Sequence, residues 1–173
     1  MNKHSINRNG VFVNTESTIL KKTERYLEKK GWKTSREVKL RGRIVDIIAT
    51  KDGKITAIKV KGSSGDIQRG IEQTLHQKNA ANFSYLAIPK DRSSKVVLST
   101  CQSLGIGLLL VNDRVEEVVK PTTSNVLPSV KNIVFKDTKK PAKVVSIKSS
   151  LESLFRSRAQ VLILKLLFLN SSR

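Results

Sequence analysis

The stretch Arg43-Ile-Val-Asp46-Ile-Ile-Ala-Thr-Lys-Asp-Gly-Lys-Ile-Thr-Ala-Ile-Lys59-Val-Lys61-Gly62 decides the fold, because it predicts two β-strands joined by a tight turn. Both arms are rich in Ile and Val, which favour strands. The Asp52-Gly53 pair between them suits a two-residue type I′ turn, in which both central residues need positive φ. The stretch therefore predicts a β-hairpin whose register is fixed by its turn.

The turn determines which residues of the hairpin lie opposite each other. Pairing starts at Lys51 and Lys54 and runs back along both arms until Asp46 lies opposite Lys59. Directly opposed residues share a face of the sheet, and Lys61 lies on the same face because strand side chains alternate with period two. One carboxylate and two ammonium groups are therefore expected on one patch.

This hairpin resembles the active-site signature of the PD-(D/E)XK nuclease superfamily, the fold group of many restriction endonucleases and archaeal Holliday-junction resolvases. The family pattern is an Asp, a hairpin, then Glu or Asp, any residue, and Lys. Asp46 matches the first acid and Lys61 the terminal lysine, whereas Lys59 stands at the position of the second acid. Val45 stands where the pattern has proline. The resemblance covers roughly residues 12 to 113.

The resemblance implies a DNA-cleaving site that uses Mg²⁺ or Mn²⁺. In the family, two acids hold the metal, the lysine positions or activates the attacking water, and a glutamate from the first helix often reaches the site. Asp46 and Glu16 are thus the metal-ligand candidates, and Lys61 and Lys59 complete the catalytic set. However, an ammonium group has no lone pair to give, and hard cations need oxygen ligands.

Three functions remain open at this point. The first is a metal-dependent DNA endonuclease whose site is impaired by Lys59. The second is a catalytically inactive DNA-binding or regulatory module, which the same substitution favours. The third is a structural protein that binds nucleic acid nonspecifically through its charge.

The remaining elements are predicted from periodicity and capping. A helix with Asn14 or Thr15 as its N-cap ends at Gly31. After the hairpin, a Gly-Ser loop leads into further elements, namely a helix from Ile67 to about Asn82, a strand over 83–88, a helix over 94–103 and a strand over 106–111. We therefore predict an α/β fold in which a mixed central sheet is flanked by helices. The order αβββαβαβ is that of a restriction-endonuclease-like core.

Composition indicates a polyanionic partner. Thirty-three Lys and Arg against fourteen Asp and Glu give a net charge of +19, and nucleic acid is the usual ligand of such a field. Aromatic residues make up only 5% of the chain and sit in apolar patterns, which argues against single-strand binding by base stacking. We therefore expect duplex or branched DNA. The candidate contacts are Arg41, Arg43, Ser63, Ser64, Gln73 and Gln77.

Other site classes are less favoured. Gln73 and Gln77 share one face of their predicted helix, whereas Gln68 lies on a different face. The single cysteine, Cys101, is expected to be a small buried apolar residue. His4 and His76 are far apart and have no cysteine partners for zinc. No signal peptide is visible near the N-terminus, so a cytoplasmic protein is expected.

Three segments are predicted along the chain. Residues 1–114 form the nuclease-like domain, and residues 115–149 form a basic, proline-containing linker or an extra hairpin. Residues 150–173 form an apolar helix that weakly resembles the start of a winged-helix domain. Its apolar run is too short for a membrane span, which needs about 18 residues. We therefore expect this helix to lie at a homodimer interface.

Overall fold

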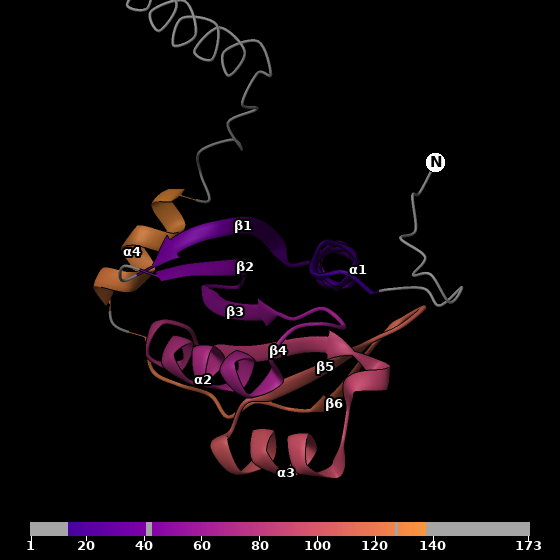
Figure 1. Cartoon of the computed structure of the whole chain (residues 1–173). Coiled ribbons are helices and arrows are strands. Elements are labelled where there is room, and N and C mark those ends of the chain that lie inside the picture. Colours follow the sequence, from indigo (N-terminus) through magenta and orange to yellow (C-terminus); the bar gives the residue numbers. More distant parts are fainter. Residues whose placement is uncertain (1–13, 41–42, 127, 138–173) are drawn as a thin grey trace, which may run out of the picture. The chain divides into compact units, whose positions relative to one another are not determined.

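The computed structural model describes residues 14–40, 43–126 and 128–137, which form a six-stranded sheet with helices packed on it (Figure 1). The helices and strands, in chain order, are α1 (Glu16–Lys29), β1 (Lys33–Leu40), β2 (Arg43–Lys51), β3 (Lys54–Val60), α2 (Ile67–Gln77), β4 (Phe83–Pro89), α3 (Lys95–Leu104), β5 (Gly107–Val111), β6 (Val115–Val119) and α4 (Pro128–Asp137). Two short 3₁₀ turns, 78–80 and 90–92, follow α2 and β4. The predicted order αβββαβαβ is the order observed from α1 to β5.

The sheet is mixed, as predicted. Its strands lie in the order β1-β2-β3-β4-β5-β6. The two pairings at one edge, β1 with β2 and β2 with β3, are antiparallel, and so is β5 with β6 at the other edge. The central pairings of β3 with β4 and of β4 with β5 are parallel, each through a crossover that contains a helix. The α/β class with a sheet flanked by helices is therefore confirmed.

The β2–β3 hairpin has the predicted turn and register. Asp52 has φ 49° and Gly53 has φ 71°, so both central residues adopt the left-handed conformation that a type I′ turn requires. Lys51 pairs with Lys54, and the ladder continues through three more pairs to the pair of Ile47 and Ile58. The turn thus sets the register of the two strands, and this register aligns Asp46 of β2 with Lys59 of β3, one position beyond the last pair.

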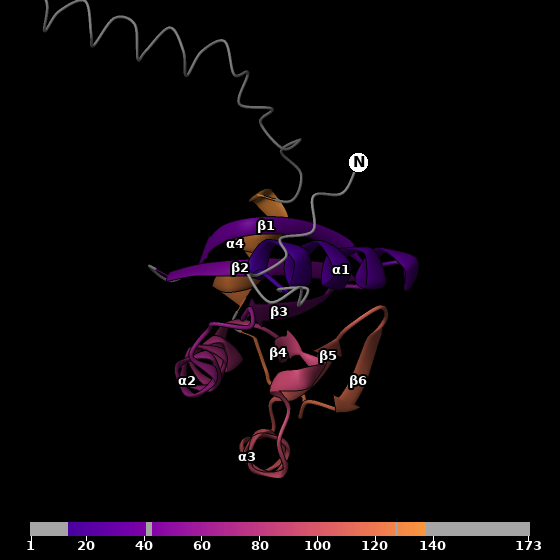
Figure 2. The ribbon, with the colours of Figure 1, turned by 45° about the vertical axis from the view of Figure 1, so that its right-hand side comes forward.

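Helix α1 covers one face of this hairpin (Figure 2). Thr15 is its N-cap, and the Thr15 hydroxyl accepts a hydrogen bond from the Thr18 backbone N–H at 3.2 Å. Ile19 and Leu27 pack on Ile58 and neighbouring side chains of the sheet. Their spacing of eight residues spans about two helical turns, so one apolar stripe faces the strands.

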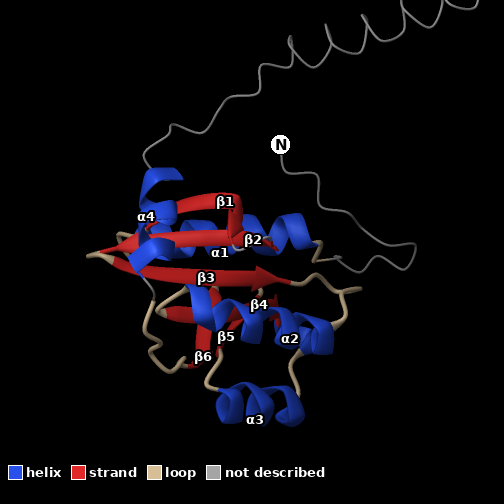
Figure 3. Ribbon diagram, turned by 90° about the vertical axis from the view of Figure 1, so that its left-hand side faces the viewer, coloured by secondary structure: helices blue, strands red, loops and turns tan. Residues whose placement is uncertain are grey.

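The opposite face of the sheet is covered by α2 and α4 (Figure 3). Side chains alternate along β3, so Ala57 and Lys59 point away from α1. Ala57 belongs to a core cluster with Val130 and Val134 of α4. Cys101 is fully buried, as predicted, and burial raises the pKa of its thiol to about 11.

The predicted linker over residues 115–149 is wrong in its first part. Residues 115–119 form β6, which pairs with β5, and residues 128–137 form a helix instead of an extra strand. Val130 is 3% exposed and Val134 is fully buried. Four residues apart, these side chains lie on one helical face and complete the core beside β1, so the domain extends past the predicted boundary at 114.

Several predictions fall outside the described residues. They concern Arg41, His4, most of the N-terminal segment, and the apolar run in 150–173 with its homodimer interface and winged-helix resemblance. No helix in the described ranges is long and apolar enough to cross a membrane.

Candidate functional site

The centre of the predicted site is an ion pair between adjacent strands. The Lys59 ammonium donates to Asp46 Oδ1 at 2.8 Å, and the side chains are only 15% and 19% exposed. The backbone N–H of Val60 donates to Asp46 Oδ2 at 2.7 Å. Regular pairing of β2 with β3 ends just before this point, and the Val60 N–H bonds to the Asp46 side chain there. Both carboxylate oxygens are therefore engaged by the protein itself.

Lys61 follows the last residue of β3 directly and makes no ion pair with Asp46. Its aliphatic stem runs across the loop before α2 and over the first turn of that helix. A Cβ atom at Gly65 would lie 3.2 Å from this stem, and one at Gly70 would lie 3.0 Å from it. The two glycines thus leave the space in which the Lys61 side chain lies.

Glu16 does not join the predicted carboxylate cluster. It is exposed in the first turn of α1 and makes no hydrogen bond or ion pair with Asp46, Lys59 or Lys61. At 100° per residue Glu16 lies on the same side of α1 as the buried residues Ile19, Thr23 and Leu27, but it stands in the exposed first turn of the helix. Its backbone is nevertheless close to the site, since a Cβ atom at Gly62 would lie 2.7 Å from Glu16 N.

These residues do not fit a Mg²⁺ or Mn²⁺ site. The two Asp46 oxygens already accept hydrogen bonds, and an ammonium group lies where an additional oxygen ligand would be needed. Within the described ranges, no group of three His, Cys, Asp or Glu side chains is arranged to hold a metal ion. The one carboxylate beside Lys59 in the described part of the chain is that of Asp46, and the Lys59 ammonium already neutralises its charge.

A cavity of about 420 Å³ opens beside Lys59, between the start of β2 and α2. We call it the Lys59 cavity, and its lining residues are Arg43, Ile44, Lys59, Gln73 and Gln77. A smaller cavity of about 120 Å³ shares Arg43 and Gln77 with it and adds His76. No acidic side chain of the described chain lines either cavity.

The two glutamines of this cavity carry unused hydrogen-bonding capacity. The side-chain oxygens of Gln73 and Gln77 are buried and have no hydrogen-bond partner in the described part of the chain. The prediction that these residues share one helix face is confirmed, and the exposed Gln68 is not part of the lining. Buried amide groups of this kind are normally satisfied by protein, water or a ligand.

The remaining predicted DNA contacts are less well placed. The Ser63 N–H donates to the Asn14 carbonyl at 2.9 Å, and the Ser63 hydroxyl donates to the same oxygen at 3.3 Å. Ser63 therefore ties the loop to the chain before α1. Ser64 is exposed and lines neither cavity. Of the predicted contacts, the fold gathers Arg43, Gln73 and Gln77 around Lys59.

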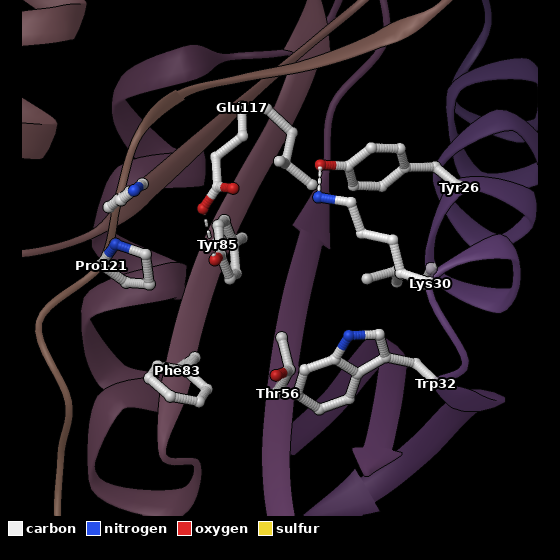
Figure 4. Close-up of a pocket in the computed structure, with 11 residues that line it drawn as sticks. Tyr26, Lys30, Trp32, Thr56, Phe83, Tyr85, Glu117 and Pro121 are labelled. Atoms are coloured by element: carbon white, nitrogen blue, oxygen red, sulfur yellow. Dashed lines mark hydrogen bonds between the residues drawn. The ribbon is translucent and has the colours of Figure 1, made fainter.

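Sequence reasoning missed a further pocket, of about 300 Å³, on the α1 face of the sheet (Figure 4). Four aromatic side chains line it, from α1, β4 and the residue before β1, namely Tyr26, Trp32, Phe83 and Tyr85. They are far apart in sequence, and each sits in an ordinary apolar pattern. No local signal could have brought them together before the fold was known.

No protein-family model matches this chain, and neither does any curated protein. Among solved structures, the chain is similar to a protein of unknown function from Silicibacter pomeroyi, with a TM-score of 0.59 and 17% sequence identity. The similarity covers 83% of this chain and 90% of that chain. At this level of identity, it shows a shared fold alone.

Proposed function

We propose that this protein binds duplex or branched DNA through the Lys59 cavity. In this proposal, the chain has the restriction-endonuclease-like core of the PD-(D/E)XK superfamily, and the Asp46–Lys59 ion pair takes the place of the metal site. The observation that carries the proposal is the geometry of Asp46, both of whose oxygens accept hydrogen bonds from the protein. Such a chain retains the DNA-binding surface without the chemistry of cleavage.

Electrostatics support DNA as the ligand. The chain carries a net charge of +19, and the described lining of the Lys59 cavity contains no acid; Lys59 is paired with Asp46, whereas Arg43 has no ion-pair partner among the described residues. The Gln73 and Gln77 amides add neutral hydrogen-bonding groups that can rotate toward phosphate oxygens. Most of the affinity would come from phosphate contacts, which carry little sequence information.

The second candidate is a metal-dependent endonuclease. The observed order of elements and the hairpin register that aligns Asp46 with Lys59 favour it. For this function a cation would have to displace the Lys59 ammonium from Asp46. Cleavage of plasmid and four-way-junction DNA with Mg²⁺ or Mn²⁺ separates the two candidates. We expect no cleavage by the wild-type chain, and metal-dependent cleavage by it would establish the endonuclease instead.

The binding site is tested by a pair of charge reversals. Arg43→Glu and Arg25→Glu change the net charge equally, but Arg43 lines the Lys59 cavity whereas the exposed Arg25 lies on α1. Fluorescence anisotropy with a labelled duplex should show a clear loss of affinity for Arg43→Glu. The slope of the logarithm of the binding constant against the logarithm of the salt concentration should also become smaller by about 1. Equal losses for both variants would show that only the overall charge matters and would place the DNA elsewhere.

The homodimer remains a proposal that rests on the apolar run within residues 161–169. Burying each Leu, Ile or Phe side chain contributes about 1.5 to 3 kcal/mol. Removal of residues 150–173 is expected to yield a monomer that still binds DNA. Sedimentation of the full chain and of the shortened chain checks this expectation, and a monomeric full chain would contradict it.

A further inference from the structure

The pocket of about 300 Å³ on the α1 face, which we call the aromatic pocket, has two walls and a polar floor (Figure 4). Tyr26, Lys30 and Trp32 form the wall on the α1 side. Phe83 and Tyr85 of β4, with residues of β6 and the segment after it, form the other wall. Thr56 of β3 lies at the floor between them. The pocket is therefore bounded by aromatic rings on both sides.

The fold fixes the ring of Tyr85 in this wall. Tyr85 pairs with Gly107 on β5, and a Cβ atom at Gly107 would lie only 2.3 Å from the Tyr85 ring. Glycine therefore leaves the space that the ring occupies. At its other end, the Tyr85 hydroxyl donates to the Glu117 carboxylate at 2.7 Å. Burial and this hydrogen bond raise the pKa of Tyr85, so the phenol stays neutral.

The floor of the pocket presents an unused polar group. Thr56 is 1% exposed, and its hydroxyl has no hydrogen-bond partner among the described residues. A buried hydroxyl normally finds a partner, in the protein, in water or in a ligand. A hydroxyl both donates and accepts, so it suits a ligand edge that carries carbonyl or N–H groups.

Cations stand beside the aromatic walls. Lys30 and Lys120 line the pocket, and Glu117, the acid in its described lining, is already hydrogen-bonded to Tyr85. The Lys30 ammonium lies 2.6 Å from the Tyr26 hydroxyl and 4.4 Å from the centre of the Tyr26 ring. The charge left for a ligand is therefore positive.

We propose that this pocket binds the base of a nucleotide. The base would stack against the aromatic walls, its polar edge would reach Thr56, and its phosphate would lie near Lys30 and Lys120. The volume of about 300 Å³ is at the lower end for small-molecule sites, which suits one ring system. A hydrocarbon chain would use neither the hydroxyl nor the lysines. This site is separate from the Lys59 cavity and does not depend on the function proposed there.

The same chemistry is present in a free nucleotide and in an unpaired base of a strand. Trp32 is the only tryptophan of the chain, so its fluorescence reports on this pocket alone. The full-length protein is titrated with thymidine monophosphate, with ribose 5-phosphate, with oligothymidine, and with an abasic strand of equal length. Quenching by the base-containing ligands and not by their base-free counterparts is the expected result.

The four titrations also identify the source of the base. Quenching by oligothymidine without quenching by the mononucleotide assigns the pocket to single-stranded nucleic acid, and the reverse assigns it to a free nucleotide. Absence of quenching by every ligand would overturn the proposal. Equal quenching by base-containing and base-free ligands would overturn it too.

Substitutions that keep Trp32 complete the test. Thr56→Val removes an unpaired hydroxyl at nearly constant volume, and it should weaken base binding about fivefold to tenfold. Lys120→Ala should weaken binding of the nucleotide but not of the nucleoside, whereas Lys95→Ala on α3 serves as the charge control. Thermal melting verifies that each variant folds. Unchanged affinity in both Thr56→Val and a Phe83→Leu variant would rule out the pocket.

Discussion

The Lys59 cavity and the aromatic pocket lie on opposite faces of the same strand. Lys59 of β3 lines the first, together with Arg43 and two glutamines, whereas Thr56 of β3 lies at the floor of the second. Alternation along the strand sends these side chains to opposite sides of the sheet. One strand thus separates a site built on charge from a site built on stacking, and each is expected to respond to different perturbations.

Salt should separate the two sites most strongly. Duplex DNA affinity is expected to fall by about 10³ to 10⁵ between 50 and 200 mM salt if six to ten phosphates are neutralised. Binding of a mononucleotide to the aromatic pocket should change far less, because it involves a single phosphate. Anisotropy and Trp32 fluorescence at several salt concentrations measure the two slopes. Similar slopes would mean that one surface accounts for both ligands.

Replacing Lys59 with glutamate should turn the Lys59 cavity into a site that binds a divalent cation, and it should leave the aromatic pocket intact. Lys59→Glu puts a second carboxylate beside Asp46, and loss of the partly buried ion pair should lower the free energy of unfolding by about 3 kcal/mol. A divalent cation would then relieve the repulsion. Manganese should therefore raise the melting temperature of Lys59→Glu and not of the wild type. An equal rise in the wild type would show that Asp46 already accepts a metal.

A substitution at Gly107 should impair the aromatic pocket and leave DNA binding at the Lys59 cavity unchanged. Gly107→Ala places a Cβ atom against the Tyr85 ring, and such overpacking typically costs about 1 to 3 kcal/mol. The displaced ring should abolish Trp32 quenching by nucleotides. DNA affinity at low salt should stay near the wild-type value, which makes it the internal control. Loss of both activities together would indicate that the two faces are coupled.

The smallest expected effect comes from Tyr85→Phe, which keeps the ring and removes the hydrogen bond to Glu117. The loss in unfolding free energy should be about 1 kcal/mol at neutral pH. Burial raises the pKa of Tyr85 above its usual value of 10.0, so this residue stabilises the fold less as pH rises above about 10. Denaturation series at pH 7 and 10.5 should therefore show a smaller difference between the two proteins at the higher pH. A difference that grows with pH would contradict the assigned environment of Tyr85.

The predicted elements that proved correct depend on local chemistry. The Asp52-Gly53 turn set the hairpin register, and the N-cap of α1 is one of the two residues predicted, Thr15. The helical face shared by Gln73 and Gln77 likewise follows from their spacing of four residues. Residues close together in sequence decide each of these features.

The errors concern the segment that forms α4 and the position of Glu16, and local periodicity decides neither of them. Residues 128–137 lie in the segment predicted as a linker or an extra hairpin, yet they form α4, because Val130 and Val134 complete a core beside β1. Glu16 had the right azimuth but lies in the exposed first turn of its helix. In both cases the outcome depends on where the helix lies relative to the sheet, which periodicity does not specify.

The sequence by itself therefore determined the order of the elements from α1 to β5, the hairpin and the juxtaposition of Asp46 with Lys59. The reason is that a two-residue turn leaves only one register for the strands it joins. Only the tertiary structure decided that α4 completes the core, that Arg43 and α2 enclose the Lys59 cavity, and that four scattered aromatic residues share one pocket. Those contacts join residues far apart in the chain, and their geometry arises only when the sheet and its covering helices pack together.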